Sequence, residues 1–175
     1  MDNLITFISK FQGIFGTLLG VTVTFVITQL SKRLGKLYFY FYDYSLVYYG
    51  KREDNTYGPI EDINKANSCY YKLRIQLYNS SEIIKVLKDF QIQFILEDKI
   101  VYSKPNNDNE KIQYTHHSEY KDFNFINILP KQLIEINLNG SIRDSDMIEI
   151  SKLKKIYLIT KNHKNRNTKK LIKKF

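Results

Sequence analysis

The feature that most constrains this chain is a stretch of twenty residues, 11–30, without a charged side chain. The stretch contains eleven Leu, Ile, Val and Phe residues. As an α-helix it would be about 30 Å long, which is the thickness of the hydrocarbon core of a bilayer. Its apolar side chains contribute on the order of −3 to −7 kcal/mol to membrane insertion. The sequence therefore predicts one transmembrane helix over residues 11–30.

Two other interpretations of this stretch are weaker. A helix buried in a soluble core is usually shorter or has a polar face. A cleaved signal peptide requires a positively charged start and a small-residue cleavage site. The first nine residues carry only the acidic Asp2, and no Ala-x-Ala-like sequence follows the stretch. We therefore expect a short tail over residues 1–10 and an anchor that stays attached.

Basic residues directly after the apolar stretch predict its orientation. Lys32, Arg33 and Lys36 fall in a short flank, residues 31–36, whereas the charges before the stretch cancel. The positive-inside rule then places the C-terminal domain in the cytoplasm, on a single-pass protein of the inner (plasma) membrane, with the three basic residues near membrane lipid. The lone Cys69 agrees, because secreted domains often carry disulfides.

Small residues recur at spacings of three and four along the apolar stretch. Such a stripe lets two helix backbones approach closely, which favours a homo-oligomer through the transmembrane helix. The alternative is that these residues face lipid. The predicted helix-association residues are Gly13, Gly16, Thr17, Gly20 and Thr24.

The rest of the chain, residues 37–175, has the pattern of one β-rich domain. Residues 37–49 are dense in aromatic residues and predict a strand with a bulge near Asp43. Residues 50–67 are polar and predict a loop. Residues 69–78 alternate between apolar and polar side chains, which is typical of a half-buried antiparallel strand.

The second half of the domain is less regular. Residues 80–89 fit either a short helix capped by Ser80 or Ser81 or an extended crossover, and residues 143–153 are ambiguous. Asn139-Gly140 is expected to close the strand that begins at Leu133. Further strands are predicted at 90–96, 99–103, 133–138, 156–160 and 168–175.

Seven to nine short strands without a strong long helix predict an antiparallel all-β domain. The pattern fits a β-sandwich or a small β-barrel and does not separate the two. The run from Leu77 to Phe90, and the Leu-Pro pair before Leu133, resemble features of immunoglobulin-type sandwiches.

No motif for catalysis or cofactor binding stands out in the sequence. It contains no Gly-rich phosphate loop and no Gly-x-Ser-x-Gly elbow, and its carboxylates are scattered. His116, His117 and Glu119 are the one cluster suggestive of a metal, but adjacent histidines on a strand point to opposite faces. We therefore expect no metal, no cofactor and no enzymatic activity.

Positive charge is concentrated at the C-terminal end. Residues 151–175 contain ten Lys or Arg and no Asp or Glu, whereas the other 150 residues are nearly balanced. This segment fits a solvated strand pair or a contact with anionic lipid. A contact with nucleic acid is a third alternative, but the segment has too few aromatic residues for base stacking. The predicted basic C-terminal patch is Lys161, Lys164, Arg166, Lys169, Lys170, Lys173 and Lys174.

These patterns predict a membrane-anchored, non-enzymatic binding module at the inner face of the membrane, with a protein or small-molecule partner. The layout is also similar to membrane effectors of bacterial defence systems, in which a ligand-sensing β-barrel drives oligomerisation of transmembrane helices. Those effectors usually have more than one helix, whereas this sequence predicts one. A closed barrel with a polar interior would favour the effector, and a solid apolar core would favour the interaction module.

Overall fold

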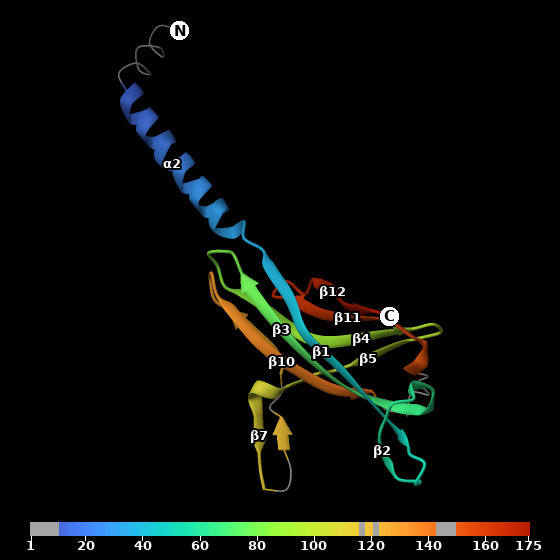
Figure 1. Ribbon diagram of the computed structural model, residues 1–175. Coiled ribbons are helices and arrows are strands. Elements are labelled where there is room, and N and C mark those ends of the chain that lie inside the picture. The colour runs from blue at the N-terminus through green and yellow to red at the C-terminus, as the bar shows by residue number, and fades with distance from the viewer. Residues whose placement is uncertain (1–10, 116–117, 121–122, 143–149) are drawn as a thin grey trace.

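The computed structural model describes residues 11–115, 118–120, 123–142 and 150–175, which form one helix projecting from the end of a β-sandwich (Figure 1). The helix, α2 (Gln12–Arg33), is continuous over 22 residues. Every side chain of α2 whose placement is described is exposed. The predicted tail, residues 1–10, lies outside the described residues.

The first sheet has five antiparallel strands in the order β2-β1-β3-β10-β6. Its two longest strands, β1 and β3, pair along most of their length. The short β2 pairs only with the last residues of β1, from Tyr48 onward. The strands are β1 (Leu37–Lys51), β2 (Tyr57–Ile60), β3 (Ala66–Asn79), β6 (Asn106–Asn107) and β10 (Leu133–Ile142).

The second sheet has the order β12-β11-β4-β5, and β9 pairs with the start of β4. A separate two-stranded hairpin, β7 with β8, extends from the body of the domain (Figure 1). These strands are β4 (Lys85–Leu96), β5 (Ile100–Ser103), β7 (Lys111–Gln113), β8 (Ser118–Tyr120), β9 (Phe125–Ile128), β11 (Leu153–Asn162) and β12 (Asn167–Lys174). Short 3-10 turns are η1 (Ile63–Lys65), η2 (Asp108–Glu110) and η4 (Ile150–Lys152).

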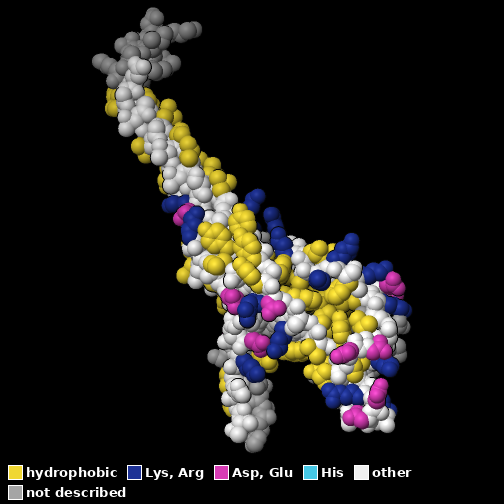
Figure 2. All heavy atoms as spheres, viewed as in Figure 1, with side chains coloured by type: hydrophobic (Ala, Val, Ile, Leu, Met, Phe, Trp, Pro, Cys, Tyr) yellow, Lys and Arg dark blue, Asp and Glu magenta, His cyan; other side chains and the backbone are white. Residues whose placement is uncertain are grey.

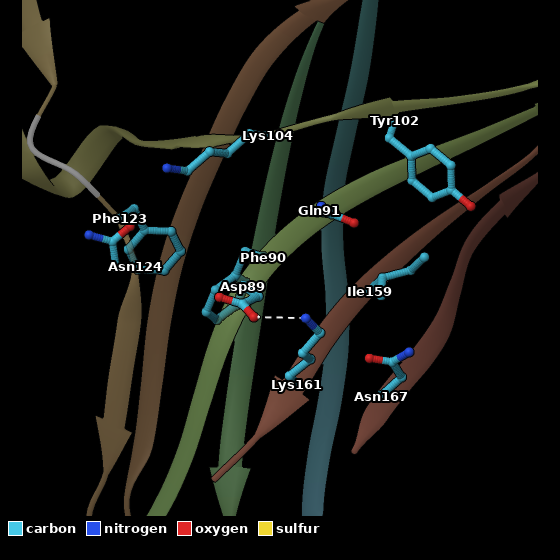
Figure 3. Close-up of a pocket in the computed structure, with 10 residues that line it drawn as sticks. All are labelled: Asp89, Phe90, Gln91, Tyr102, Lys104, Phe123, Asn124, Ile159, Lys161 and Asn167. Atoms are coloured by element: carbon cyan, nitrogen blue, oxygen red, sulfur yellow. Dashed lines mark ion pairs between the residues drawn. The ribbon is translucent and has the colours of Figure 1, made fainter. Parts of the chain in front are cut away.

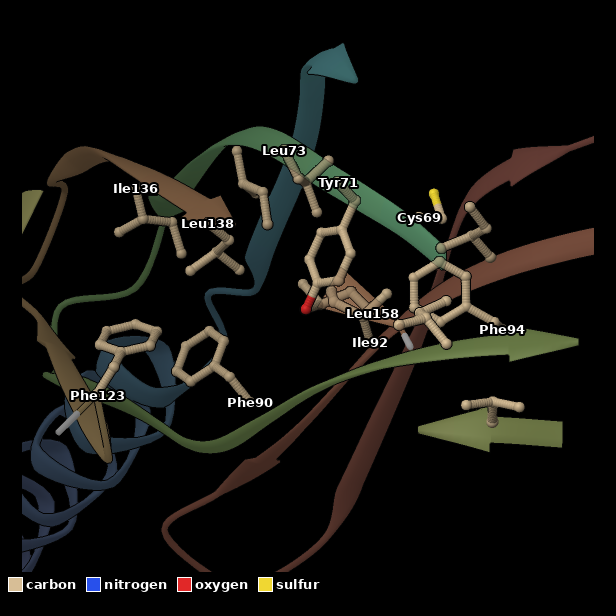
Figure 4. Packing of buried hydrophobic residues seen from close by; sticks show 14 of the residues in the cluster. Cys69, Tyr71, Leu73, Phe90, Ile92, Phe94, Phe123, Ile136, Leu138 and Leu158 are labelled. Carbon is tan, nitrogen blue, oxygen red and sulfur yellow. The ribbon is translucent and has the colours of Figure 1, made fainter. Parts of the chain in front are cut away.

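The core lies between the two sheets and is made of large apolar side chains (Figure 4). Alternate residues of β3 and β10 point inward from one sheet and meet those of β4 and β11. Tyr71 packs on Phe94 with ring centroids 5.5 Å apart, and Phe90 on Phe123 at 4.5 Å. Of the two architectures that strand alternation leaves open, the structure is the sandwich.

Several predicted elements are confirmed. The first strand is present, with a register shift between Phe41 and Asp43 where the bulge was expected. The alternating strand over residues 69–78 lies within β3 and turns its apolar side chains into the core. The last segment pairs back on β11 as β12.

One open alternative is resolved, because residues 80–89 contain no helix and lead directly into β4, which begins at Lys85. Two predictions are corrected. The predicted loop over 50–67 contains the short strand β2. Asn139-Gly140 does not end its strand, because β10 continues to Ile142. Residues 143–149, part of the ambiguous segment, lie outside the described residues.

Gly140 has a packing role instead of a turn role. A Cβ atom at this position would collide with the phenol of Tyr71, which crosses over the strand. The Tyr71 hydroxyl is then within 2.9 Å of the Ser103 hydroxyl. Glycine within a strand often marks such a close approach.

Candidate functional site: the exposed helix and the adjoining end of the sandwich

The most distinctive surface of the molecule is the helix. α2 exposes large apolar side chains on all sides, and it is long and apolar enough to cross a bilayer. Figure 2 shows hydrophobic side chains along it and charged ones only near the domain. By length and composition, α2 fits a membrane anchor or a signal sequence.

The predicted helix-association residues lie along this exposed helix. Cβ atoms built on Gly13, Gly16 and Gly20 would meet nothing within 4 Å, so this face is open to an approaching backbone. The Thr17 hydroxyl donates a hydrogen bond to the Gly13 carbonyl at 2.8 Å, which satisfies it without water. Self-association through this face stays a prediction.

The connection between helix and domain is short and tightly held. The Lys36 amide donates to Ser80 Oγ at 2.9 Å, and the Ser80 amide donates to the Lys36 carbonyl at 3.0 Å. The Glu82 amide donates to the Lys32 carbonyl at 3.2 Å. A Cβ atom on Gly35 would collide with the backbone of Ser81. The loop between β3 and β4 is therefore packed directly against the end of the helix.

That loop is fixed by a buried side chain, Asn79, at the end of β3. Asn79 is 0% exposed. Its Nδ2 donates to the carbonyls of Ile83 at 2.8 Å, Ile128 at 3.0 Å and Leu129 at 3.0 Å. Its Oδ1 accepts from the amide of Ser81 at 3.0 Å. One amide group thus joins the β3–β4 loop to the chain entering the β9–β10 turn.

An ion pair at the surface connects the same two loops. Lys131 Nζ lies 3.1 Å from Glu82 Oε1 and donates to the Ser80 carbonyl at 2.8 Å. Both charged side chains are about half exposed, so the pair is worth at most about 1 kcal/mol. Through Lys131, the β9–β10 turn contacts the β3–β4 loop beside the helix.

The structure divides the predicted basic C-terminal patch. Asn162 pairs with Leu87 near the start of β4, so the β11–β12 turn is towards the helix side of the sandwich (Figure 1). Lys164 and Arg166 lie in or beside this turn, with Lys161 just before it. Lys173 and Lys174 pair with Ile156 and Lys155 at the opposite end of the hairpin.

The two remaining lysines of the patch contact aromatic rings along β12. Lys169 Nζ is 4.1 Å from the centroid of the Tyr157 ring, and Lys170 Nζ is 5.4 Å from that of Phe39. β12 is an edge strand, and lysines on an edge discourage pairing with another chain. These contacts give Lys169 and Lys170 aromatic neighbours within the chain.

Two clefts lie on the outer faces of the sheets. The larger, about 430 Å³, holds an ion pair of 3.0 Å between Asp89 and Lys161, with Tyr102 on its rim (Figure 3). Asp89 has a left-handed backbone, φ 53°, where β4 bends. The smaller, about 270 Å³, is lined by charged residues that include Asp43, Lys72 and Arg74.

The described side chains offer little reactive chemistry. Burial raises the pKa of the Cys69 thiol to about 12, so it is protonated at neutral pH. Burial also raises the pKa of Tyr44. Within the described ranges, no group of three or more His, Cys, Asp or Glu is placed to hold a metal ion. His116 and His117 lie outside those ranges.

Comparison with known proteins places the chain in a family. A family model described as the YopI Ig-like domain matches residues 35–173. The SPbeta prophage-derived uncharacterized protein YopI of Bacillus subtilis (strain 168) is 30% identical over 181 residues, covering 100% of both chains.

Two solved structures are similar to this chain at lower sequence identity. An uncharacterized β-sandwich protein from Clostridium difficile 630 is 14% identical with a TM-score of 0.39, covering 79% of this chain and 86% of that one. A Northeast Structural Genomics Consortium target is 8% identical with a TM-score of 0.39, covering 79% and 83%. On the family match and the full-length relative, the chain belongs to the YopI Ig-like domain family.

Proposed function

We propose that this protein is a membrane-anchored, non-enzymatic interaction module. In this proposal α2 spans the cell membrane, and the Ig-like domain lies at its cytoplasmic face, where it holds a protein or small-molecule partner. The observation that carries the proposal is the exposure of α2. A 22-residue helix is about 33 Å long, and here its apolar side chains have no protein surface against them. Only a bilayer or other helices would remove them from water.

The basic residues at the domain end of α2 support the cytoplasmic orientation. Lys32 and Lys36 are exposed beside the helix end, and Lys131 lies on the adjoining turn. Positive charge that flanks a membrane helix is retained on the cytoplasmic side.

The character of the core supports an interaction module over a ligand-sensing barrel. The interior between the sheets is filled by large aliphatic and aromatic side chains, with Phe94, Leu77 and Leu158 fully buried. The effector alternative requires a closed barrel with a polar interior. Two separate sheets packed on an apolar core do not provide one.

Membrane fractionation and a topology reporter test this proposal. The full chain should sediment with bacterial membranes, resist an alkaline carbonate wash and dissolve in detergent. A fluorescent reporter fused after Phe175 should be active, and an alkaline phosphatase fused there should be inactive. The matched control is the double variant Val21→Lys and Phe25→Lys, which places two charges in the helix and should release the protein. Recovery of the unaltered chain in the carbonate supernatant, or digestion of its domain by protease added to intact cells, would contradict the proposal.

A further inference from the structure

We propose that the end of the sandwich beside α2 is itself a membrane-binding surface that sits in the headgroup layer of an anionic bilayer. We call this surface the proximal end and define it as residues 32–36, 80–85 and 129–132. The inference rests on the proposed function, because α2 brings the proximal end to the bilayer. It goes further by assigning a lipid contact to two loops that are distant from α2 in the sequence.

Charge at the proximal end is mainly positive. Its residues include five basic side chains and a single acidic one, a net formal charge of +4. The acidic residue, Glu82, forms an ion pair with Lys131. The basic residues are Lys32, Arg33, Lys36, Lys85 and Lys131.

The turns at the opposite end of the sandwich have a different balance of basic and acidic residues. The turns there, residues 51–65 and 96–99, contain four basic and six acidic residues. The β11–β12 turn adds three more cations, Lys161, Lys164 and Arg166, on the helix side. It is set back from the proximal end by roughly 10 Å, since Asn162 pairs with Leu87, three residues after Ile84. The contrast is one between turns, because Lys154, Lys155, Lys173 and Lys174 add positive charge on the strands at the opposite end. The turns nearest the helix are the basic ones, as expected for loops that face anionic lipid.

The loops of the proximal end also expose aliphatic side chains. Leu34 is 76% exposed, Ile84 52% and Leu129 50%, and Ile83 next to them is 36% exposed. Loops that face only water are usually built from small and polar residues. Aliphatic side chains interleaved with lysines match an interfacial layer, where the apolar groups enter the acyl boundary and the ammonium groups remain among phosphates.

Aromatic residues form a second band just below these loops. Tyr38 stacks on Tyr40 with ring centroids 6.4 Å apart and on Tyr78 at 6.2 Å. They lie at the start of β1 and the end of β3, on the outer face of the sheet. In Figure 2, hydrophobic side chains gather on the domain directly below the helix. Tyrosine is favoured at the level of the headgroups.

The occupant of this surface follows from its connection to α2. The hydrogen bonds between Lys36 and Ser80, and between Glu82 and Lys32, hold the β3–β4 loop against the last turn of the helix. The Asn79 amide holds the β9–β10 turn in the same unit. Once α2 is in the bilayer, these loops cannot swing away from it. The surface they form therefore meets the headgroups and not a soluble protein.

Depth-dependent fluorescence quenching tests the inference on the full-length chain in vesicles. The variant Ile84→Cys is labelled with an environment-sensitive fluorophore, and buried Cys69 stays unlabelled in the folded protein. Vesicles of phosphatidylcholine, with and without phosphatidylglycerol, carry a nitroxide lipid quencher near the headgroups. We expect about a twofold or greater loss of emission, larger with phosphatidylglycerol because of the basic residues. The matched control is Glu53→Cys on the opposite turn, where emission should be unaffected.

Charge variants provide a second measurement. Lys36→Glu with Lys85→Glu should reduce quenching at position 84 in the anionic vesicles, whereas Lys51→Glu with Lys65→Glu, at the opposite end, should not. If the chain floats with vesicles but the label at 84 is not quenched, the inference is wrong and the anchor stands. If the label is shielded only when a soluble protein is added, the surface is a protein site and the inference is also wrong. If the chain does not float, both the anchor and the inference fail.

Discussion

Asn79 shows how one side chain determines the shape of the sandwich beside the helix. It continues the inward-facing alternation of β3 that includes Ile75 and Leu77, so the sequence places a polar group on the apolar face. A buried amide must find partners, and Asn79 finds them in two loops. That requirement could be predicted from the alternation. The full set of carbonyl partners could not be predicted, because two of the three belong to Ile128 and Leu129, 49 and 50 positions away.

Cys69 makes stability sensitive to alkaline pH. Burial raises its pKa to about 12 in the folded chain, whereas an unfolded thiol titrates near 8.5. Because the folded pKa is the higher one, the stabilisation is complete below about pH 8.5 and is lost as the pH rises towards 12. We expect the free energy of unfolding in detergent to fall by up to about 1.4 kcal/mol per pH unit in that window.

Cys69→Ala is the control for this effect. It should lower stability at neutral pH but flatten the start of the decline near pH 8.5, below the usual tyrosine pKa of about 10. Denaturant midpoints across the pH range give the measurement. Rapid reaction of Cys69 with a thiol reagent in the folded protein at pH 8 would be inconsistent with its burial.

At the scale of elements, periodicity was the reliable guide. The 2-residue alternation of β3 and the aromatic density of β1 predicted both strands and the bulge at Asp43. The sequence does not predict β2 or β6, because β2 contains a Pro and β6 is only two residues long. The pair Asn139-Gly140 predicts a turn, but it lies within a strand. Glycine is needed there because a Cβ atom would collide with the Tyr71 ring, and the sequence pattern of such a position is the same as that of a turn.

The open glycine face of α2 allows a clean test of self-association. A Cβ atom added at Gly20 has no neighbour within 4 Å outside the adjoining helix backbone, so a loss of association in Gly20→Ile reports on a second helix. We expect the free energy of helix association in membranes, measured by crosslinking, to weaken by on the order of 1 kcal/mol. Val21→Ile, a neighbouring change outside the small-residue stripe, should have no effect. If the Gly20→Ile variant forms the dimer equally well, this face of α2 is not the contact between the helices.

At the scale of the whole molecule, the sequence predicted an apolar helix followed by an all-β domain. It did not decide between sandwich and barrel, because alternation within a strand is the same in both. That choice depends on pairing between strands distant in sequence, such as β3 with β10. The sequence does not predict the compact junction either, although Gly35, within the basic flank just before β1, is its local sign.

Gly35 tests whether helix and domain form one unit. Gly35→Val would place methyl groups against the Ser81 backbone, so the β3–β4 loop must separate from the helix end. We expect a loss of about 1–3 kcal/mol of stability and faster trypsin cleavage after Lys36. Gly13→Val, whose Cβ meets nothing within 4 Å, should change neither. Equal cleavage rates in the two variants would show that the junction is already loose.

The clamped junction has a mechanical consequence. If α2 spans a membrane as proposed, its close attachment to the sandwich links the tilt of the helix to the orientation of the domain. Bilayer thickness influences that tilt, so it would also influence the position of the β1–β2 turn at the far end of the sandwich. A protein that binds this turn would then meet it at a distance from the lipid that depends on the thickness of the bilayer.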